Sequence, residues 1–147
     1  MIAYVDSSLL TRAYLPDEKG HDEAQILLRR PGLAFVTGRL TRIEVSGALV
    51  RAARAGRHVP AVHSIATLDS DLGAGGRIVE VNPSAQAVEQ HALALVREHG
   101  LRALDALHLA TAVLSVPQLA DKGEPIGFAS RDGGQATVAE SLGFAAV

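Results

Sequence analysis

The stretch IAYVDSS at residues 2–8 sets the fold class of this chain. Its first four residues are an apolar run, which predicts a short buried strand. Asp6 stands directly at the end of this strand, and Ser7 and Ser8 are residue types that favour the start of a helix. The expected helix ends at Pro16, because a proline disfavours helical geometry in the residue before it. A strand that leads directly into a helix is the building unit of α/β proteins.

The rest of the chain repeats this alternation. Further strands are expected at residues 33–36, 78–81, 125–129 and 143–147. Helices are expected at residues 17–30, 37–55, from Pro60 to the glycines at 73–76, 85–99, 104–116 and 132–142. This order predicts a mostly parallel sheet of about five strands with helices on both faces, an α/β/α sandwich. The length of 147 residues favours a single domain that spans residues 1–147.

Composition excludes several classes of protein. Hydrophobic residues make up 48% of the chain, which excludes a disordered protein. The absence of cysteine excludes a disulfide framework, a thiolate zinc site and a catalytic thiol. The N-terminus lacks the basic segment of a signal peptide, and no apolar run is long enough to span a bilayer. These features predict a cytoplasmic protein with no membrane attachment.

Basic residues are concentrated in the first part of the chain. Residues 1–57 contain nine basic and six acidic residues, whereas residues 58–147 contain five basic and ten acidic ones. Of the 14 basic residues 12 are arginines, whose guanidinium groups suit paired hydrogen bonds to phosphate. A surface that contacts a nucleic acid and a solvated helix face explain this pattern equally well. For the first explanation, the candidate nucleic-acid contacts are Arg39, Arg42, Arg51 and Arg54.

Two aspartates follow predicted strands. Asp6 ends the first strand, and Asp132 closes the segment FASRD at residues 128–132, just after the fourth. Sites in open parallel sheets form at the carboxyl ends of the strands, so these carboxylates converge if the two strands are neighbours. Each aspartate could instead only cap the helix that follows it, and for either one alone this simpler explanation is favoured.

Two further acids lie in helices that are otherwise apolar. Glu44 has only apolar or small residues one turn away, so it faces the interior or a cleft. Such a carboxylate needs a cation or hydrogen bonds, and an ion pair with Arg51 is the simpler alternative. Asp105 lies in LDALHLATA at residues 104–112, where it could merely favour the helix dipole. His108 shares its face and, taken alone, is better explained as a buried residue than as a metal ligand.

Four carboxylates without cysteine would form a site of hard oxygen donors. Such a site selects Mg²⁺ or Mn²⁺ over Zn²⁺. Carboxylates held close together raise one another's pKa unless a divalent ion neutralises them. A hydrated Mg²⁺ also engages substrate phosphates and can generate hydroxide. This chemistry suits the hydrolysis of a phosphodiester bond.

Four motifs, in this order, resemble those of the PIN domain family. They are YVDSS at 4–8, RIEVSGAL at 42–49, LDALHLATA at 104–112, and FASRD at 128–132 followed by AESLGF at 139–144. Length and motif order resemble the VapC toxins of bacterial toxin–antitoxin pairs, and the resemblance covers essentially the whole chain. It implies a PIN-like fold and a Mg²⁺- or Mn²⁺-dependent endoribonuclease that cuts structured RNA (tRNA or rRNA) to inhibit translation.

The resemblance also implies roles for particular residues. It implies a catalytic metal site formed by Asp6, Glu44, Asp105 and Asp132. Asp6 and Asp105 are the expected direct ligands. Ser130 is expected to hydrogen-bond to the acids, and Ser7 is a weaker candidate for the same role. A VapB-type antitoxin and a second copy of the chain, in a homodimer, are the implied partners. One departure from the family pattern is the pair of glycines after Asp132, which predicts a late start of the last helix.

Other functions compete with the toxin. A phosphatase of the haloacid dehalogenase type would carry a second Asp two residues after Asp6, where this chain has Ser8. A receiver domain is disfavoured because no Asp follows the second strand and no Lys follows the fourth. Within the PIN family, the alternatives are a housekeeping RNA-processing nuclease and a non-catalytic scaffold that binds RNA or protein.

Overall fold

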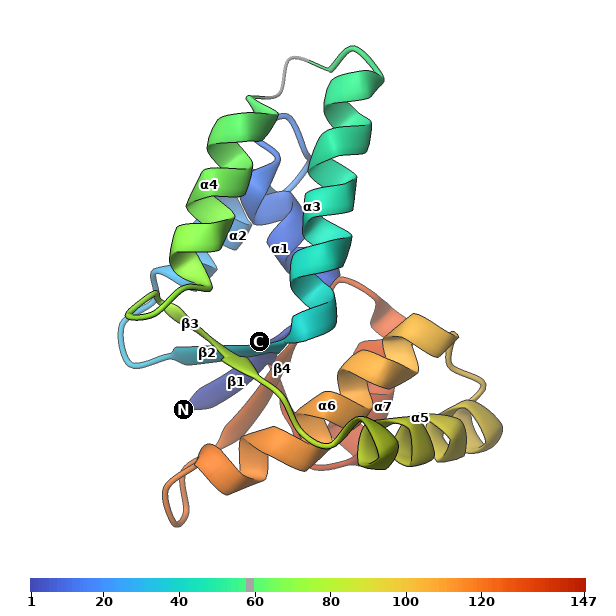
Figure 1. The fold of residues 1–147 in the computed structure, drawn as a ribbon. Coiled ribbons are helices and arrows are strands. Elements are labelled where there is room, and N and C mark those ends of the chain that lie inside the picture. Colours follow the sequence, from blue (N-terminus) through green and yellow to red (C-terminus); the bar gives the residue numbers. More distant parts are fainter. Residues whose placement is uncertain (58–59) are drawn as a thin grey trace.

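The computed structural model of the protein describes residues 1–57 and 60–147. Five parallel strands form one sheet in the order β3-β2-β1-β4-β5 (Figure 1). The strands are β1 Ile2–Val5, β2 Ala34–Gly38, β3 Ile78–Val81, β4 Ile126–Ala129 and β5 Ala145–Ala146. The helices of the described residues are α1 Ser7–Tyr14, α2 His21–Leu28, α3 Arg39–Arg54, α4 Ala61–Asp71, α5 Ala85–His99, α6 Ala103–Leu119 and α7 Gly133–Ser141. The predicted parallel sheet of five strands is confirmed.

The first strand is buried on both faces and divides the core in two. Ala3 and Val5 pack with residues of α1 to α4, whereas Ile2 and Tyr4 pack with residues of α5 to α7. Side chains alternate between the faces of a strand, so a strand covered on both sides has an unbroken apolar sequence. Figure 1 shows the two helical layers on opposite sides of the sheet. No helix in the described part of the chain has the length and apolar character needed to cross a bilayer.

Strand β2 is longer than the sequence predicts. The expected strand ended at residue 36 and a helix began at Thr37, but β2 continues to Gly38 and α3 begins at Arg39. Thr37 and Gly38 pair with the end of β3, and the Thr37 hydroxyl donates a hydrogen bond to the carbonyl of Val5 at 2.7 Å. Both partners are distant in the sequence, so tertiary pairing overrides the local pattern here.

Helix α2 begins four residues later than predicted. The expected start was Asp17, but the helix begins at His21, after Gly20 at a φ of 88°. This left-handed backbone is one that glycine adopts without steric cost. Asp17 and Glu18 instead pair with Arg57, which follows α3 in the sequence, at 2.6 Å and 2.9 Å.

Helix α6 continues past the proline that was expected to stop it. Pro117 lies inside the helix, which runs on to Leu119. A proline removes one intrahelical hydrogen bond. Ser115 and Val116 are buried beside it, so packing holds the last turn against the core.

Candidate active site

The ends of β1 and β4 bring Asp6 and Ser130 together. The two strands are neighbours, with Val5 paired to Ala129, as the convergence of their acids requires. The Ser130 hydroxyl donates to Oδ2 of Asp6 at 2.7 Å. The backbone N–H of Asp132 in turn donates to Oγ of Ser130 at 3.0 Å. The serine therefore links the carboxylate at one strand end to the backbone at the other.

Asp6 is held in a fixed position. It is only 3% exposed, and its Oδ1 accepts hydrogen bonds from the Ser8 hydroxyl at 2.8 Å and the Leu9 N–H at 3.1 Å. The bond from Leu9 makes Asp6 the N-cap of α1, the role that the sequence offered as the simpler explanation of this residue, while Ser7 and Ser8 lie in the first turn of the helix. The capping role and a place in the site are therefore compatible, because the cap fixes the carboxylate at the end of β1.

Glu44 extends from α3 and is bound to α6. Its Oε2 lies 2.5 Å from Nε2 of His108, a residue that is 3% exposed. Burial alone raises the pKa of Glu44, but the hydrogen bond and charge of His108, together with the Ser7 hydroxyl, bring it below its ordinary value. Among the described residues, the ion-pair partner of Glu44 is His108 and not the Arg51 that the sequence left open.

Asp105 lies close enough to Asp132 and Asp6 for their charges to affect its pKa. Burial raises the pKa of its carboxyl, and the charges of Asp132 and Asp6 raise it further. Arg102 and His108 act in the opposite direction but do not outweigh these effects. Three of the four predicted acids therefore interact electrostatically at the carboxyl end of the sheet.

The last helix starts directly after Asp132, not late. The Asp132 carboxylate accepts a hydrogen bond from the N–H of Gln135 at 2.9 Å, and α7 begins at Gly133. A side-chain cap of this kind stabilises a helix start by about 1 kcal/mol, which offsets the cost of glycine in the first turn. Asp132 thus stands at the carboxyl edge of the sheet, as Asp6 does.

Gln135 is a buried residue that contacts Ser130 and Asp105, and the sequence did not indicate it as a site candidate. It is 0% exposed, and its amide Nε2 donates to the backbone carbonyl of Asp105 at 3.0 Å. Its Oε1 lies 2.7 Å from Oγ of Ser130, whose single hydrogen serves either this oxygen or Asp6. The one sequence signal was its place three residues after Asp132, the spacing of a helix capping box.

The donor chemistry of these residues fits a hard divalent cation. All four acids offer oxygen, and burial together with the charges of Asp132 and Asp6 raises the pKa of Asp105, an effect that a bound cation would counteract. In the described residues, however, no three Asp, Glu, His or Cys side chains are arranged to hold an ion together.

Comparison with known proteins identifies the family. The sequence model of the PIN domain family matches residues 3–116, which is most of the chain. The protein belongs to the PIN domain family. No curated protein matches its sequence.

Solved structures share the fold of this PIN domain at low sequence identity. VapBC2 from Rickettsia felis, bound to a DNA fragment from their promoter, has a TM-score of 0.62 at 9% identity and covers 100% of this chain and 98% of its own. VapC20 of Mycobacterium tuberculosis, a sarcin–ricin loop cleaving toxin, has a TM-score of 0.59 at 21% identity, and the match covers 97% of this chain and 96% of VapC20. FitAcB from Neisseria gonorrhoeae has a TM-score of 0.51 at 17% identity, and the match covers 99% of this chain and 96% of FitAcB.

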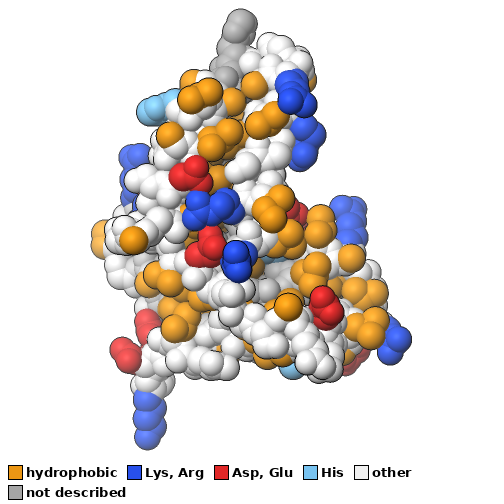
Figure 2. All heavy atoms as spheres, in the orientation of Figure 1, with side chains coloured by type: hydrophobic (Ala, Val, Ile, Leu, Met, Phe, Trp, Pro, Cys, Tyr) orange, Lys and Arg blue, Asp and Glu red, His pale blue; other side chains and the backbone are white. Residues whose placement is uncertain are grey.

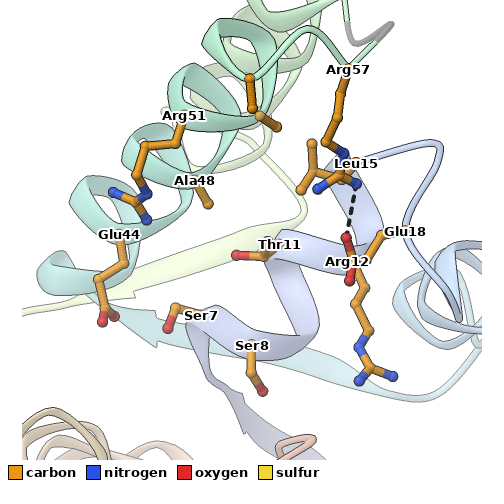
Figure 3. A pocket seen from close by; sticks show the side chains of 12 residues that line it. Ser7, Ser8, Thr11, Arg12, Leu15, Glu18, Glu44, Ala48, Arg51 and Arg57 are labelled. Atoms are coloured by element: carbon orange, nitrogen blue, oxygen red, sulfur yellow. Dashed lines mark hydrogen bonds and ion pairs between the residues drawn. The ribbon is translucent and has the colours of Figure 1, made fainter.

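A groove of about 530 Å³ runs between α1 and α3 of the PIN domain and begins at Glu44 (Figure 3). Hydroxyl groups of Ser7, Ser8 and Thr11 line one wall, and Arg51 lines the other. Figure 3 shows Arg51 folded back along α3 toward Glu44. Gly47 leaves room for this, since a Cβ there would lie 3.0 Å from Nη1 of Arg51. The groove thus combines hydroxyl donors with a guanidinium beside the acidic site.

The four arginines of the predicted RNA surface have different surroundings. Arg42 pairs with Asp69 of α4 and Glu80 of β3, and donates to a backbone carbonyl at 3.2 Å. Arg39 lies 3.9 Å from Glu80, while Arg54 is exposed near the end of α3. Figure 2 shows basic and acidic side chains next to each other on the face formed by α3 and α4. Of the four, Arg51 alone lines the groove that begins at Glu44.

Proposed function

We propose that this PIN domain is a Mg²⁺- or Mn²⁺-dependent endoribonuclease and the toxin of a VapBC-type toxin–antitoxin pair. The observation that carries the proposal is the convergence of acids at the carboxyl end of the sheet. Burial and the charges of Asp132 and Asp6 raise the pKa of Asp105, as expected for a site that a divalent ion stabilises. The fold shared with VapC20, a toxin that cleaves the sarcin–ricin loop, supports structured RNA as the substrate class.

In this proposal the acids hold the ion and their neighbours hold the acids. Asp6 and Asp105 are direct ligands, whereas Glu44 and Asp132 bind directly or through water. When bound, Mg²⁺ or Mn²⁺ supplies a hydroxide nucleophile and stabilises charge on the phosphate oxygens. Ser8 and Ser130 orient Asp6 through their hydroxyl groups.

The RNA is held through contacts to its phosphate groups, and the side chain of Arg51 provides the principal one. The groove that it lines opens at Glu44, so a phosphate held there would lie beside the acids. Stacking of bases on aromatic rings would require exposed aromatic residues. The Tyr and Phe side chains are all buried, namely Tyr4, Tyr14, Phe35, Phe128 and Phe144, and the chain contains no Trp. Contacts to phosphate should therefore dominate, and RNA affinity should fall steeply with salt.

Replacement of Arg51 should weaken RNA binding more than replacement of Arg54. Both arginines are exposed on α3, but only Arg51 lines the groove. We expect Arg51→Ala to reduce RNA affinity several-fold at low salt and to lower the slope of log affinity against log salt by about 1. Binding is measured by filter retention in EDTA, where no metal supports cleavage. Equal losses in Arg51→Ala and Arg54→Ala would show that the groove is not the RNA site.

An antitoxin and a second copy of the chain complete the proposal. VapBC2, whose fold this chain shares, was crystallised on a DNA fragment from its promoter. A gene for a small DNA-binding protein directly upstream, and co-purification of its product, would support the toxin over a housekeeping nuclease. Light scattering of the purified chain tests the homodimer, for which a mass of about twice 15.3 kDa is expected.

Cleavage of total cellular RNA tests the activity. We expect discrete products in Mg²⁺ or Mn²⁺ that vanish with EDTA and with Asp6→Asn, which keeps an oxygen to cap α1. Asp121→Asn makes the same chemical change at an exposed loop and serves as the matched control. Sequencing of the product ends gives the target. Stable binding of RNA by folded protein that cuts nothing in Mn²⁺ would favour the non-catalytic scaffold.

A further inference from the structure

Hydrogen bonds around His108 form one continuous chain from β2 to Glu44. The N–H of Gly38 donates to the Tyr4 hydroxyl at 3.1 Å, and this hydroxyl lies 2.9 Å from Nδ1 of His108. Nε2 on the other side of the ring contacts Oε2 of Glu44. A carboxylate only accepts, so Nε2 of His108 donates to Glu44, and Nδ1 forms the hydrogen bond with Tyr4. The ring is therefore held at both of its nitrogens.

The parts of this chain are fixed by packing. Tyr4 is 0% exposed, and its ring stacks on Phe128 with centroids 5.5 Å apart and an angle of 7° between the planes. Gly38 permits the close approach of strand and ring, because a Cβ there would lie 2.9 Å from the Tyr4 hydroxyl oxygen. The imidazole is thus anchored to the centre of the sheet through a buried tyrosine.

Glu44 needs such an anchor more than Asp6 and Asp132 do. Asp6 and Asp132 are N-caps, so backbone N–H groups hold their carboxylates. Glu44 lies within α3, where the backbone N–H groups are used by the helix itself. A glutamate in such a place has several rotatable bonds, and only side-chain partners can select one of its conformations.

We propose that Tyr4 and His108 are positioning residues that fix Glu44 through Oε2 and so leave Oε1 for the divalent ion. This inference rests on the proposed metal-dependent function. Partners that orient metal ligands typically contribute about 10- to 100-fold to metal affinity or activity. The pair of residues acts through Glu44 and does not touch the ion or the RNA.

Asn and Gln at position 108 test this proposal, because they carry the same amide group on side chains of different length. The Gln amide reaches about as far as Nε2 of histidine and can still donate to Glu44, whereas the Asn amide reaches only as far as Nδ1. We expect His108→Asn to weaken the Kd for Mn²⁺, measured by electron paramagnetic resonance, by about 10-fold or more. His108→Gln should stay within about threefold of the wild type, since it keeps the bond that orients the carboxylate. Cleavage rates at saturating Mn²⁺ and melting temperatures in EDTA are recorded for the same proteins.

The outcomes separate this proposal from the one on which it rests. Absence of Mn²⁺ binding by the wild type would overturn the metal-dependent function and the positioning role with it. Mn²⁺ binding by the wild type with equal Kd values for the Asn and Gln variants would overturn the positioning role alone. If His108→Asn does not fold, Tyr4→Phe decides, because it removes only the hydroxyl that fixes the ring. An unchanged Kd for Mn²⁺ in that variant would also overturn the role.

Discussion

Asp105→Asn is expected to abolish RNA cleavage and, at the same time, to stabilise the metal-free protein. The carboxylate of Asp105 is a proposed direct ligand of the ion, and an amide is a much weaker ligand for Mg²⁺ or Mn²⁺. Even the partners of metal ligands contribute about 10- to 100-fold, so loss of the ligand itself should reduce cleavage by at least about 100-fold. The measurement is the rate of cleavage of one defined RNA at saturating metal.

The gain in stability follows from the raised pKa of Asp105. Its carboxyl is desolvated and faces the charges of Asp132 and Asp6, so the folded protein disfavours its ionised form. The amide carries no charge, and we expect Asp105→Asn to gain roughly 0.5–1 kcal/mol, a modest value because the group is partly exposed. For a chain of this size that is an increase of about 2 °C in melting temperature in EDTA.

The pH dependence of this gain has a definite sign. A carboxyl whose pKa is higher in the folded than in the unfolded state reduces stability when ionised and not when protonated in both states. The advantage of the asparagine variant should therefore be complete at neutral pH and vanish as the pH falls below the ordinary value for an aspartate. Added Mn²⁺ should raise the melting temperature of the wild type but not of the variant. A variant that is less stable than the wild type in EDTA would contradict the clustering of like charges around Asp105.

Local sequence predicts those parts of the site whose geometry is local. Strand β1 is an apolar run that ends at Asp6, and its burial on both faces follows from that run. Asp132 and Ser130 follow β4 in the same way, and parallel strands end at the same edge of the sheet. Capping of α1 and α7 by aspartates follows from residue type, although the glycines after Asp132 suggested a later start for α7.

Contacts between distant segments could not be predicted in this way. The partner of Glu44 is His108, 64 residues away, whereas the sequence offered Arg51 at helical spacing. Thr37 and Gly38 belong to β2 because β3 pairs with them, a partner more than 40 residues further on. Gln135 shows no sign of its burial except its spacing from Asp132. In each case the missing information is which elements lie side by side, and this depends on the packed sheet.

The second large effect is expected for Gln135→Glu. Glutamine and glutamate differ at one atom and fill the same volume, so the substitution adds charge without changing packing. Gln135 is 0% exposed, and its Nε2 donates to the carbonyl of Asp105 at 3.0 Å. A carboxylate would place an acceptor against that carbonyl and add a negative charge to the site of Asp6, Asp105 and Asp132. A buried charge without a partner typically costs about 3–5 kcal/mol, which corresponds to roughly 10 °C in melting temperature.

The loss should depend on pH in the opposite direction to ordinary acid denaturation. Burial beside other acids raises the folded-state pKa of the new carboxyl at position 135. Its cost is therefore complete above that pKa and decreases as the pH falls from that pKa to the ordinary pKa of a glutamate, because the protonated acid is neutral and can donate. Gln90→Glu makes the same change on the exposed face of α5, and we expect it to stay within about 0.5 kcal/mol of the wild type.

Gln135→Met separates the charge from the lost hydrogen bond. Methionine fills a similar volume without charge, so it removes the donor to Asp105, whose carbonyl still accepts a hydrogen bond within α6. The cost of this loss should be about 1 kcal/mol and should not vary with pH. The difference between the Glu and Met variants then measures the cost of the buried charge, which combines its desolvation with repulsion from the surrounding acids. Because a bound divalent ion would reduce this repulsion, Mn²⁺ should reduce the difference in melting temperature between the Glu and Met variants. A gap that is unchanged by Mn²⁺, in a protein that binds the ion, would place the ion away from Gln135 and from the acids that surround it.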